Sequence, residues 1–101
     1  MLDASEQELL VETLPKLSRM KSILRFDLSD GAGLTIDART DKPIVVEDGS
    51  LDPDCTIKTS RENMIKLIRG EMDAILAYTL GRIKVQGSLD IAMKLVKAIG
   101  S

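Results

Sequence analysis

Residues 24–38 read LRFDLSDGAGLTIDA, and this stretch decides the fold class. Apolar residues stand at every second position from Leu24 to Leu28 and again from Leu34 to Ala38. A period of two is typical of strands with one buried face and one wet face. The segment between them, 29–33, contains turn residues and two glycines, so the stretch predicts a β-hairpin. A phosphate-binding loop also uses paired glycines, but it leads into a helix, whereas a strand follows here.

The segment before the hairpin has the spacing of an amphipathic helix. Ser5 and Glu8 stand three residues apart, as in a capping box, and Leu10, Leu14 and Leu17 follow on one face. We expect a helix from about Ser5 to Leu14. Pro15 lacks a backbone N–H and is expected to kink or end that helix.

The segments after the hairpin predict alternating strands and helices. We expect strands at 44–47, 55–59 and 83–86, and helices from Ser60 to Gly70, from Asp73 to Leu80 and from Ser88 to Ile99. Together with the hairpin this order gives five strands. It predicts an α+β fold, in which helices stack on one face of a mostly antiparallel sheet.

Residues 73–80 are apolar around most of the expected helix. Such a helix has too little polar surface for simple one-sided packing, so we expect it to be enclosed or to line an interior space. Met64, Met72 and Met93 lie in or beside the last three helices. Methionine adapts to irregular space, which suits a pocket for flexible apolar ligands, although a plain core uses methionine equally well.

Composition excludes several classes of function. The chain has 101 residues, which predicts one domain over 1–101. It contains no histidine, so neither the commonest metal ligand nor the usual proton shuttle is present, and we expect no metal and no cofactor. A net charge of −2 and only 2% aromatic residues argue against nucleic-acid binding. Cys55 has no histidine to activate it and falls on the buried side of its strand, so we expect it to pack in the core.

Nothing in the sequence indicates a membrane span or an oxidising compartment. No apolar run approaches the ~20 residues that cross a bilayer, the first residues do not resemble a signal peptide, and the single cysteine forms no internal disulfide. We expect a cytoplasmic protein, whose oligomeric state the sequence does not indicate. The acidic stretch 47–54 lacks the spacing of a calcium loop and is expected to be a solvated turn.

Two pairs of basic residues suggest an anionic membrane surface as a partner. Lys66 with Arg69, and Lys94 with Lys97, lie three residues apart on their helices. Ordinary solvated faces explain both pairs. A transient contact with anionic membrane headgroups is the alternative, since it needs only a local cationic patch.

Four segments in the second half resemble one known family. They are DCTIK at 54–58, MIKLIRGEM at 64–72, GRIKVQG at 81–87 and LDIAMKL at 89–95. In this order and at these separations they resemble the sterol carrier protein type-2 domain, the small non-specific lipid-transfer family. The resemblance implies five strands with helices on one side, enclosing a hydrophobic tunnel for fatty acyl chains, acyl-CoA, phospholipids or sterols, without catalysis.

The family often has an aromatic pair just before its last strand, whereas Ala77-Tyr-Thr-Leu80 stands here. A slim acyl chain therefore fits the expectation better than a sterol. Combining the strand alternation, the helical periodicity and the resemblance, we expect the tunnel to be lined by Phe26, Ile36, Ile57, Met64, Leu67, Met72, Ile75, Leu76, Leu80, Ile83, Val85, Met93 and Val96.

Three functions remain open at this point. The first is a lipid carrier or lipid-presenting domain. The second is an accessory interaction module whose apolar groove receives a helix of a partner protein. The third is a small hydrolase, which without histidine needs a Ser–Lys pair as its nucleophile and base.

Overall fold

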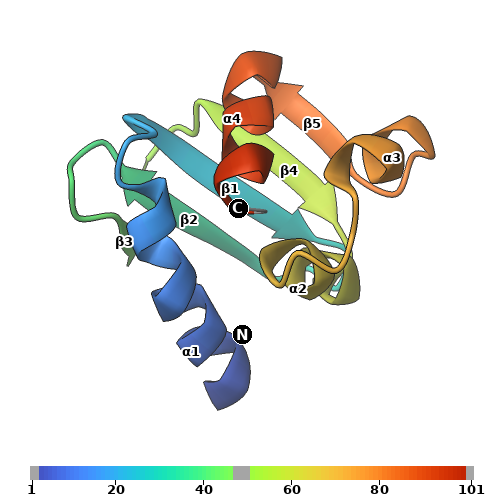
Figure 1. The fold of residues 1–101 in the computed structure, drawn as a ribbon, viewed down its shortest axis with the longest axis horizontal. Coiled ribbons are helices and arrows are strands. Elements are labelled where there is room, and N and C mark those ends of the chain that lie inside the picture. Colours follow the sequence, from blue (N-terminus) through green and yellow to red (C-terminus); the bar gives the residue numbers. More distant parts are fainter. Residues whose placement is uncertain (1–2, 47–50, 100–101) are drawn as a thin grey trace.

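The computed structural model describes residues 3–46 and 51–99. Its elements follow the predicted order, with a short 3₁₀ helix, η1, after the first α-helix (Figure 1). They are α1 (Ala4–Thr13), η1 (Leu14–Leu17), β1 (Ser22–Leu28), β2 (Gly33–Ala38), β3 (Ile44–Val46), β4 (Cys55–Thr59), α2 (Arg61–Ile68), α3 (Ala74–Thr79), β5 (Lys84–Gly87) and α4 (Leu89–Ile99).

Within the described residues the five strands form one sheet in the order β3-β2-β1-β4-β5. The predicted hairpin is present as β1 and β2, and Gly31 in its turn has a φ of +91°, which favours glycine. Three neighbouring pairs are antiparallel, and the pair of β1 with β4 is parallel. The predicted α+β fold with a mostly antiparallel sheet is confirmed, as a mixed sheet with the helices on one face (Figure 1).

The alternation predicted for the strands sorts their side chains between the two faces of the sheet. Leu24, Phe26 and Leu28 of β1 are buried beneath the helices, as are Cys55 and Ile57 of β4. Arg25 and Asp27 lie on the opposite face, where their side chains form an ion pair of 2.6 Å. The core is therefore aliphatic apart from Phe26, and it lies between the sheet and the helical layer.

The first helix begins at Ala4, one residue earlier than predicted, and its capping residue lies two residues earlier. Its N-cap is Asp3, whose side chain accepts a hydrogen bond from the Glu6 backbone N–H, while the Glu6 side chain accepts one from the Asp3 N–H. The predicted capping box of Ser5 and Glu8 was wrong, because Asp3 and Glu6 have the same three-residue spacing and an equally good capping group. The α-helix ends at Thr13, and Pro15 lies in the 3₁₀ turn that continues it, in agreement with the predicted break.

The loop between β3 and β4 is described only in part. Glu47, the predicted end of the third strand, lies outside the described residues, as do residues 48–50 of the acidic stretch. Asp54, at the end of that stretch, accepts a hydrogen bond from the Ile23 backbone N–H through its carboxylate and one from the Ser88 N–H through its carbonyl. Asp54 therefore ties the start of α4 to the sheet.

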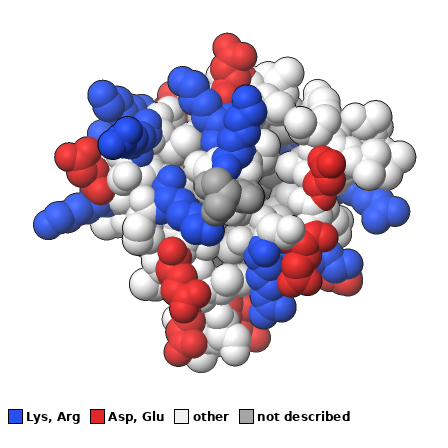
Figure 2. Space-filling model, in the orientation of Figure 1, with Lys and Arg blue, Asp and Glu red and all other residues white. Residues whose placement is uncertain are grey.

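Helix α3 lies at the periphery and not inside the fold. Among its residues only Ala77 is buried, while Ile75, Leu76 and Tyr78 are about half exposed. Of the two alternatives predicted for this helix, enclosure was wrong, whereas Ala74, Ile75 and Tyr78 do line interior space. Seen from the helix side, the surface over α3 carries few charged side chains (Figure 2).

Candidate functional site

A row of apolar side chains across three strands forms the floor of the candidate site. Phe26 of β1 lies beside Ile57 of β4, and Ile57 lies beside Val85 of β5 in the register of the sheet. Because paired residues point to the same side of a sheet, the three side chains face the helices together. The period-two pattern of the sequence predicts the buried face of each strand, and the strand order brings the three residues together.

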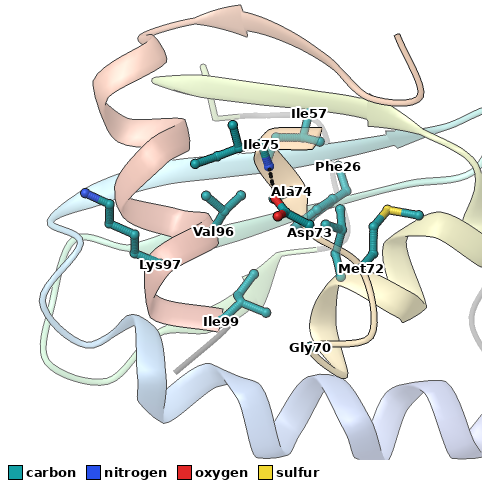
Figure 3. A pocket seen from close by; sticks show the side chains of 11 residues that line it. Phe26, Ile57, Gly70, Met72, Asp73, Ala74, Ile75, Val96, Lys97 and Ile99 are labelled. Carbon is teal, nitrogen blue, oxygen red and sulfur yellow. Dashed lines mark hydrogen bonds between the residues drawn. The ribbon is translucent and has the colours of Figure 1, made fainter. Parts of the chain in front are cut away.

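A cavity of about 240 Å³ lies above this floor, between the sheet and the three later helices (Figure 3). The segment joining α2 to α3 closes one side, and α4 closes the other. The residues that line this cavity are Phe26, Ile57, Leu67, Gly70, Met72, Asp73, Ala74, Ile75, Val96, Lys97 and Ile99.

A second cavity, of about 80 Å³, adjoins the first between α3, β5 and the first half of α4. Apart from the hydroxyl of Tyr78, its lining side chains are apolar: Ile57, Ala74, Ile75, Tyr78, Ile83, Val85, Leu89, Ala92, Met93 and Val96. The two cavities share Ile57, Ala74, Ile75 and Val96. The structure therefore places two apolar spaces next to each other, with residues of β4, α3 and α4 in the lining of both.

Two charged residues, Asp73 and Lys97, line the larger cavity. The Asp73 carboxylate caps α3 by accepting hydrogen bonds from the backbone N–H groups of Ile75 and Leu76, at 3.0 and 3.1 Å. Lys97 contributes its aliphatic stem, and its ammonium group points away from the cavity (Figure 3). The interior is thus suited to an apolar guest, and its charged groups lie at the edge.

Nine of the thirteen residues predicted to line a tunnel border one or both of these cavities. They are Phe26, Ile57, Leu67, Met72, Ile75, Ile83, Val85, Met93 and Val96. This placement brings together residues from strands and helices that lie up to 70 positions apart in the chain, from Phe26 to Val96.

The other four predicted residues do not line either cavity. Ile36 and Met64 are each 1% exposed and pack in the core, Ile36 on β2 one strand beyond the floor. Leu76 and Leu80 are 54% and 60% exposed, because α3 turns Ala77 toward the core. Alternation and helical periodicity identify a buried side but do not locate a cavity along it.

Several lining residues were not predicted. Leu89 and Ile99 share the helical stripe of Met93 and Val96 on α4, so periodicity already contained the signal for them. Ala74 and Ala92 line the cavities because small side chains leave space, and the sequence carries no comparable signal for such positions. Tyr78 lies one turn after Ala74 on α3.

No chemical group of the site stands out as catalytic. Cys55 is buried as predicted, and burial raises the pKa of its thiol, so the reactive thiolate is disfavoured. Across residues 3–46 and 51–99, no cluster of three or more Cys, Asp or Glu side chains is placed to hold a metal ion. Crossing a bilayer takes about 20 apolar residues in one helix, and none of the helices in the described residues meets that requirement.

Comparison with protein families adds a match over nearly the whole chain. The model of the SCP-2 sterol transfer family matches residues 3–100. Sterol carrier protein 2 of Rattus norvegicus is 29% identical over 84 residues, which cover 78% of this chain and 15% of the rat protein. The chain therefore spans about a sixth of the length of the curated relatives that it matches first.

Solved structures share the fold. The sterol carrier protein domain 2 of Helicoverpa armigera superposes with a TM-score of 0.77 at 26% identity, covering 96% of this chain and 87% of that one. Palmitated SCP2L2 from Aedes aegypti has a TM-score of 0.63 at 19% identity, covering 93% of this chain and 94% of the other. At that identity the second comparison speaks for the fold alone.

Proposed function

Because the chain belongs to the SCP-2 sterol transfer family, we propose that it binds the acyl chain of a lipid between the sheet, α3 and α4, and carries or presents that lipid without catalysis. The observation that carries the proposal is the pair of adjoining apolar cavities of about 240 and 80 Å³. We propose the whole chain as a single lipid-binding domain and place it in the cytoplasm. The family match favours this role over that of a module that receives a partner's helix.

Removal of the acyl chain from water supplies the driving force. Burial contributes about 0.8 kcal/mol per methylene, so a sixteen-carbon chain gains on the order of 10 kcal/mol before ordering costs. After those costs, binding in the micromolar range or tighter remains reasonable.

A fatty acyl chain suits the space better than a sterol does. The larger cavity lies just below the ~300–1,000 Å³ typical of ligand pockets, so some widening is required. Helix α3 is the wall that can move, since Ala77 is its only buried residue. Phe26 and Tyr78 are the only rings in the chain, which leaves few partners for stacking on a rigid ring system.

Filling the shared part of the two cavities tests the proposal. Ala74 lines both cavities and Ala4 is exposed on α1, so Ala74→Trp and Ala4→Trp are matched substitutions at a lining site and a remote site. We expect native mass spectrometry and calorimetry with palmitate to show binding by the wild type and by Ala4→Trp, and binding weakened at least about tenfold in Ala74→Trp.

Circular dichroism establishes whether each variant is folded. If Ala74→Trp does not fold, Val96→Phe tests the same space, because Val96 also lines both cavities. A wild-type protein that binds neither palmitate nor a sterol, and that carries no lipid after purification, would contradict the proposal. Equal palmitate affinity in the folded filled variant and the wild type would show that the ligand binds elsewhere.

A further inference from the structure

We propose that the exposed apolar surface of α3 and the start of α4 docks on an anionic bilayer. This inference rests on the proposed function, because it describes how a bound lipid would pass between the cavity and a membrane. The surface, called the apolar patch below, consists of Ile75, Leu76, Tyr78, Leu80 and Leu89.

The apolar patch gathers most of the large hydrophobic side chains that the described residues leave in water. Its members are 46–60% exposed, and outside it only Val11 on α1 and Ile44 on β3 are comparably exposed among the described residues. Single exposed hydrophobics are common, but five within residues 75–89 are a concentration of the kind that marks an interaction site.

The apolar patch borders the opening of the candidate site. Ile75, Tyr78 and Leu89 line the smaller cavity and are at the same time about half exposed. Each therefore has one side toward the cavity and one side toward solvent. A bilayer resting on the apolar patch would cover this rim, so that an acyl chain could leave the cavity without entering water.

The charge around the apolar patch is complementary to anionic lipid. The whole chain has a net charge of −2, but residues 73–99 contain four cations and two carboxylates, a net charge of +2. The cations are Arg82, Lys84, Lys94 and Lys97, and the carboxylates are Asp73 and Asp90. Basic side chains lie over α4, beside the largely uncharged surface over α3 (Figure 2). Apolar and cationic groups together are what adsorption to an anionic interface requires.

Ion pairing separates the two basic pairs that the sequence pointed to. Lys66 Nζ on α2 lies 3.3 Å from Glu62 Oε1, and Arg69, the C-cap of α2, has its Nη1 atom 3.9 Å from Glu71 Oε1. Within residues 3–46 and 51–99, neither Lys94 nor Lys97 forms an ion pair. The cations of α4 are therefore available to phosphates, whereas those of α2 are already compensated.

Vesicle flotation tests the docking surface with a matched control. Leu76 and Leu80 belong to the apolar patch but line neither cavity, so Leu76→Ser/Leu80→Ser removes two of the five hydrophobic side chains of the patch and changes no side chain that lines a cavity. Val11→Ser/Ile44→Ser removes the same number of exposed hydrophobics elsewhere. On phosphatidylcholine vesicles containing phosphatidylglycerol we expect the first variant to partition at least about tenfold more weakly than the wild type, and the second to match the wild type.

The contribution of charge to vesicle binding is tested separately. Binding should fall when phosphatidylglycerol is omitted or salt is raised, and Lys94→Glu should weaken it, because screening and charge reversal both act on the headgroup contact. Tyr78 is the only tyrosine in a chain without tryptophan. Its fluorescence therefore reports on the apolar patch alone, and brominated lipid in the vesicles should quench it.

The outcomes separate this inference from the proposed function. If Leu76→Ser/Leu80→Ser still binds palmitate but no longer binds vesicles, the result supports both the docking surface and the proposed function. Vesicle binding that the variant leaves unchanged overturns the docking surface, whatever the palmitate result. The docking surface is also overturned if the wild-type protein does not bind vesicles but forms a dimer, or a complex with a purified partner, and the variant does not. The apolar patch would then be a protein interface. Docking without palmitate binding contradicts only the proposed function.

Discussion

Helices α3 and α4 both border the candidate site, but α4 is packed against the sheet whereas most of α3 is exposed. Both sequences are rich in apolar residues. Helix α4 has eleven residues and buries Ala92, Leu95 and Ile99, whereas α3 has six residues and buries only Ala77. The apolar residues of α4 lie on one side, so the sheet can cover them, while those of α3 surround the helix and cannot all be covered. The arrangement of apolar residues around a helix decides its burial, more than their number does.

The largest expected effect compares the same substitution on the two helices. Leu95 on α4 is 1% exposed and Leu76 on α3 is 54% exposed. Leu95→Ala should lower the free energy of unfolding by about 2–5 kcal/mol, because it leaves a cavity in the core. Leu76→Ala should change it by less than about 0.5 kcal/mol. Urea denaturation followed by circular dichroism measures both, and similar losses would show that α3 is packed as firmly as α4.

The glycines next to these helices extend the comparison to the backbone. Gly81 follows α3 with a φ of +78°, and Gly87 precedes α4 with a φ of +88°. A Cβ on Gly87 would lie 2.6 Å from the Asp54 carbonyl oxygen, whereas none of the described atoms lies within 4 Å of a Cβ on Gly81. Gly87→Ala should therefore lower the free energy of unfolding by about 3 kcal/mol, from the left-handed conformation and the overlap together.

Gly81→Ala is the matched control for the conformational part. It should lower the free energy of unfolding by about 1 kcal/mol, because alanine must adopt the same left-handed conformation there but overlaps with none of the described neighbouring atoms. Thermal and urea denaturation of the two variants provide the measurement. Equal destabilisation would mean that the close approach of Gly87 to Asp54 is relieved by a small shift of the loop and does not hold α4 in place.

The sequence predicts the floor of the site better than its walls. Period-two alternation places Phe26, Ile57 and Val85 each on the buried face of its strand, and the strand order then joins them into the apolar row. Alternation does not state which strand lies beside which, because strand order comes from long-range packing. For that reason Ile36 shares the correct face but lies one strand beyond the cavity.

The walls depend on how each helix is rotated. On α4 the single apolar stripe fixes the rotation, so Met93 and Val96 could be predicted to line the site. On α3 apolar residues occur around most of the helix, and the sequence offers no preferred side. The structure turns Ala77 inward and leaves Leu76 and Leu80 outward, which the periodicity of the sequence does not distinguish.

The smallest expected effect concerns the caps of the two helices. The Ser88 hydroxyl caps α4 by accepting a hydrogen bond from the Ile91 N–H at 3.2 Å, and Asp73 caps α3 by accepting from Ile75 and Leu76. Ser88→Ala should lower the free energy of unfolding by about 1 kcal/mol, because α4 unfolds only with the whole domain. Asp73→Ala should leave that global value nearly unchanged, because α3 can open locally.

Amide hydrogen exchange separates the local effect from the global one. In Asp73→Ala the N–H groups of Ile75 and Leu76 lose their acceptor, so they should exchange about fivefold to tenfold faster while the strand amides keep their protection. Asp73→Asn retains a capping oxygen and serves as the control, with exchange close to that of the wild type. If Asp73→Ala instead speeds exchange in β1 and β4, α3 is coupled to the core. The helix would then be a fixed wall, and widening of the cavity for an acyl chain would have to come from α4.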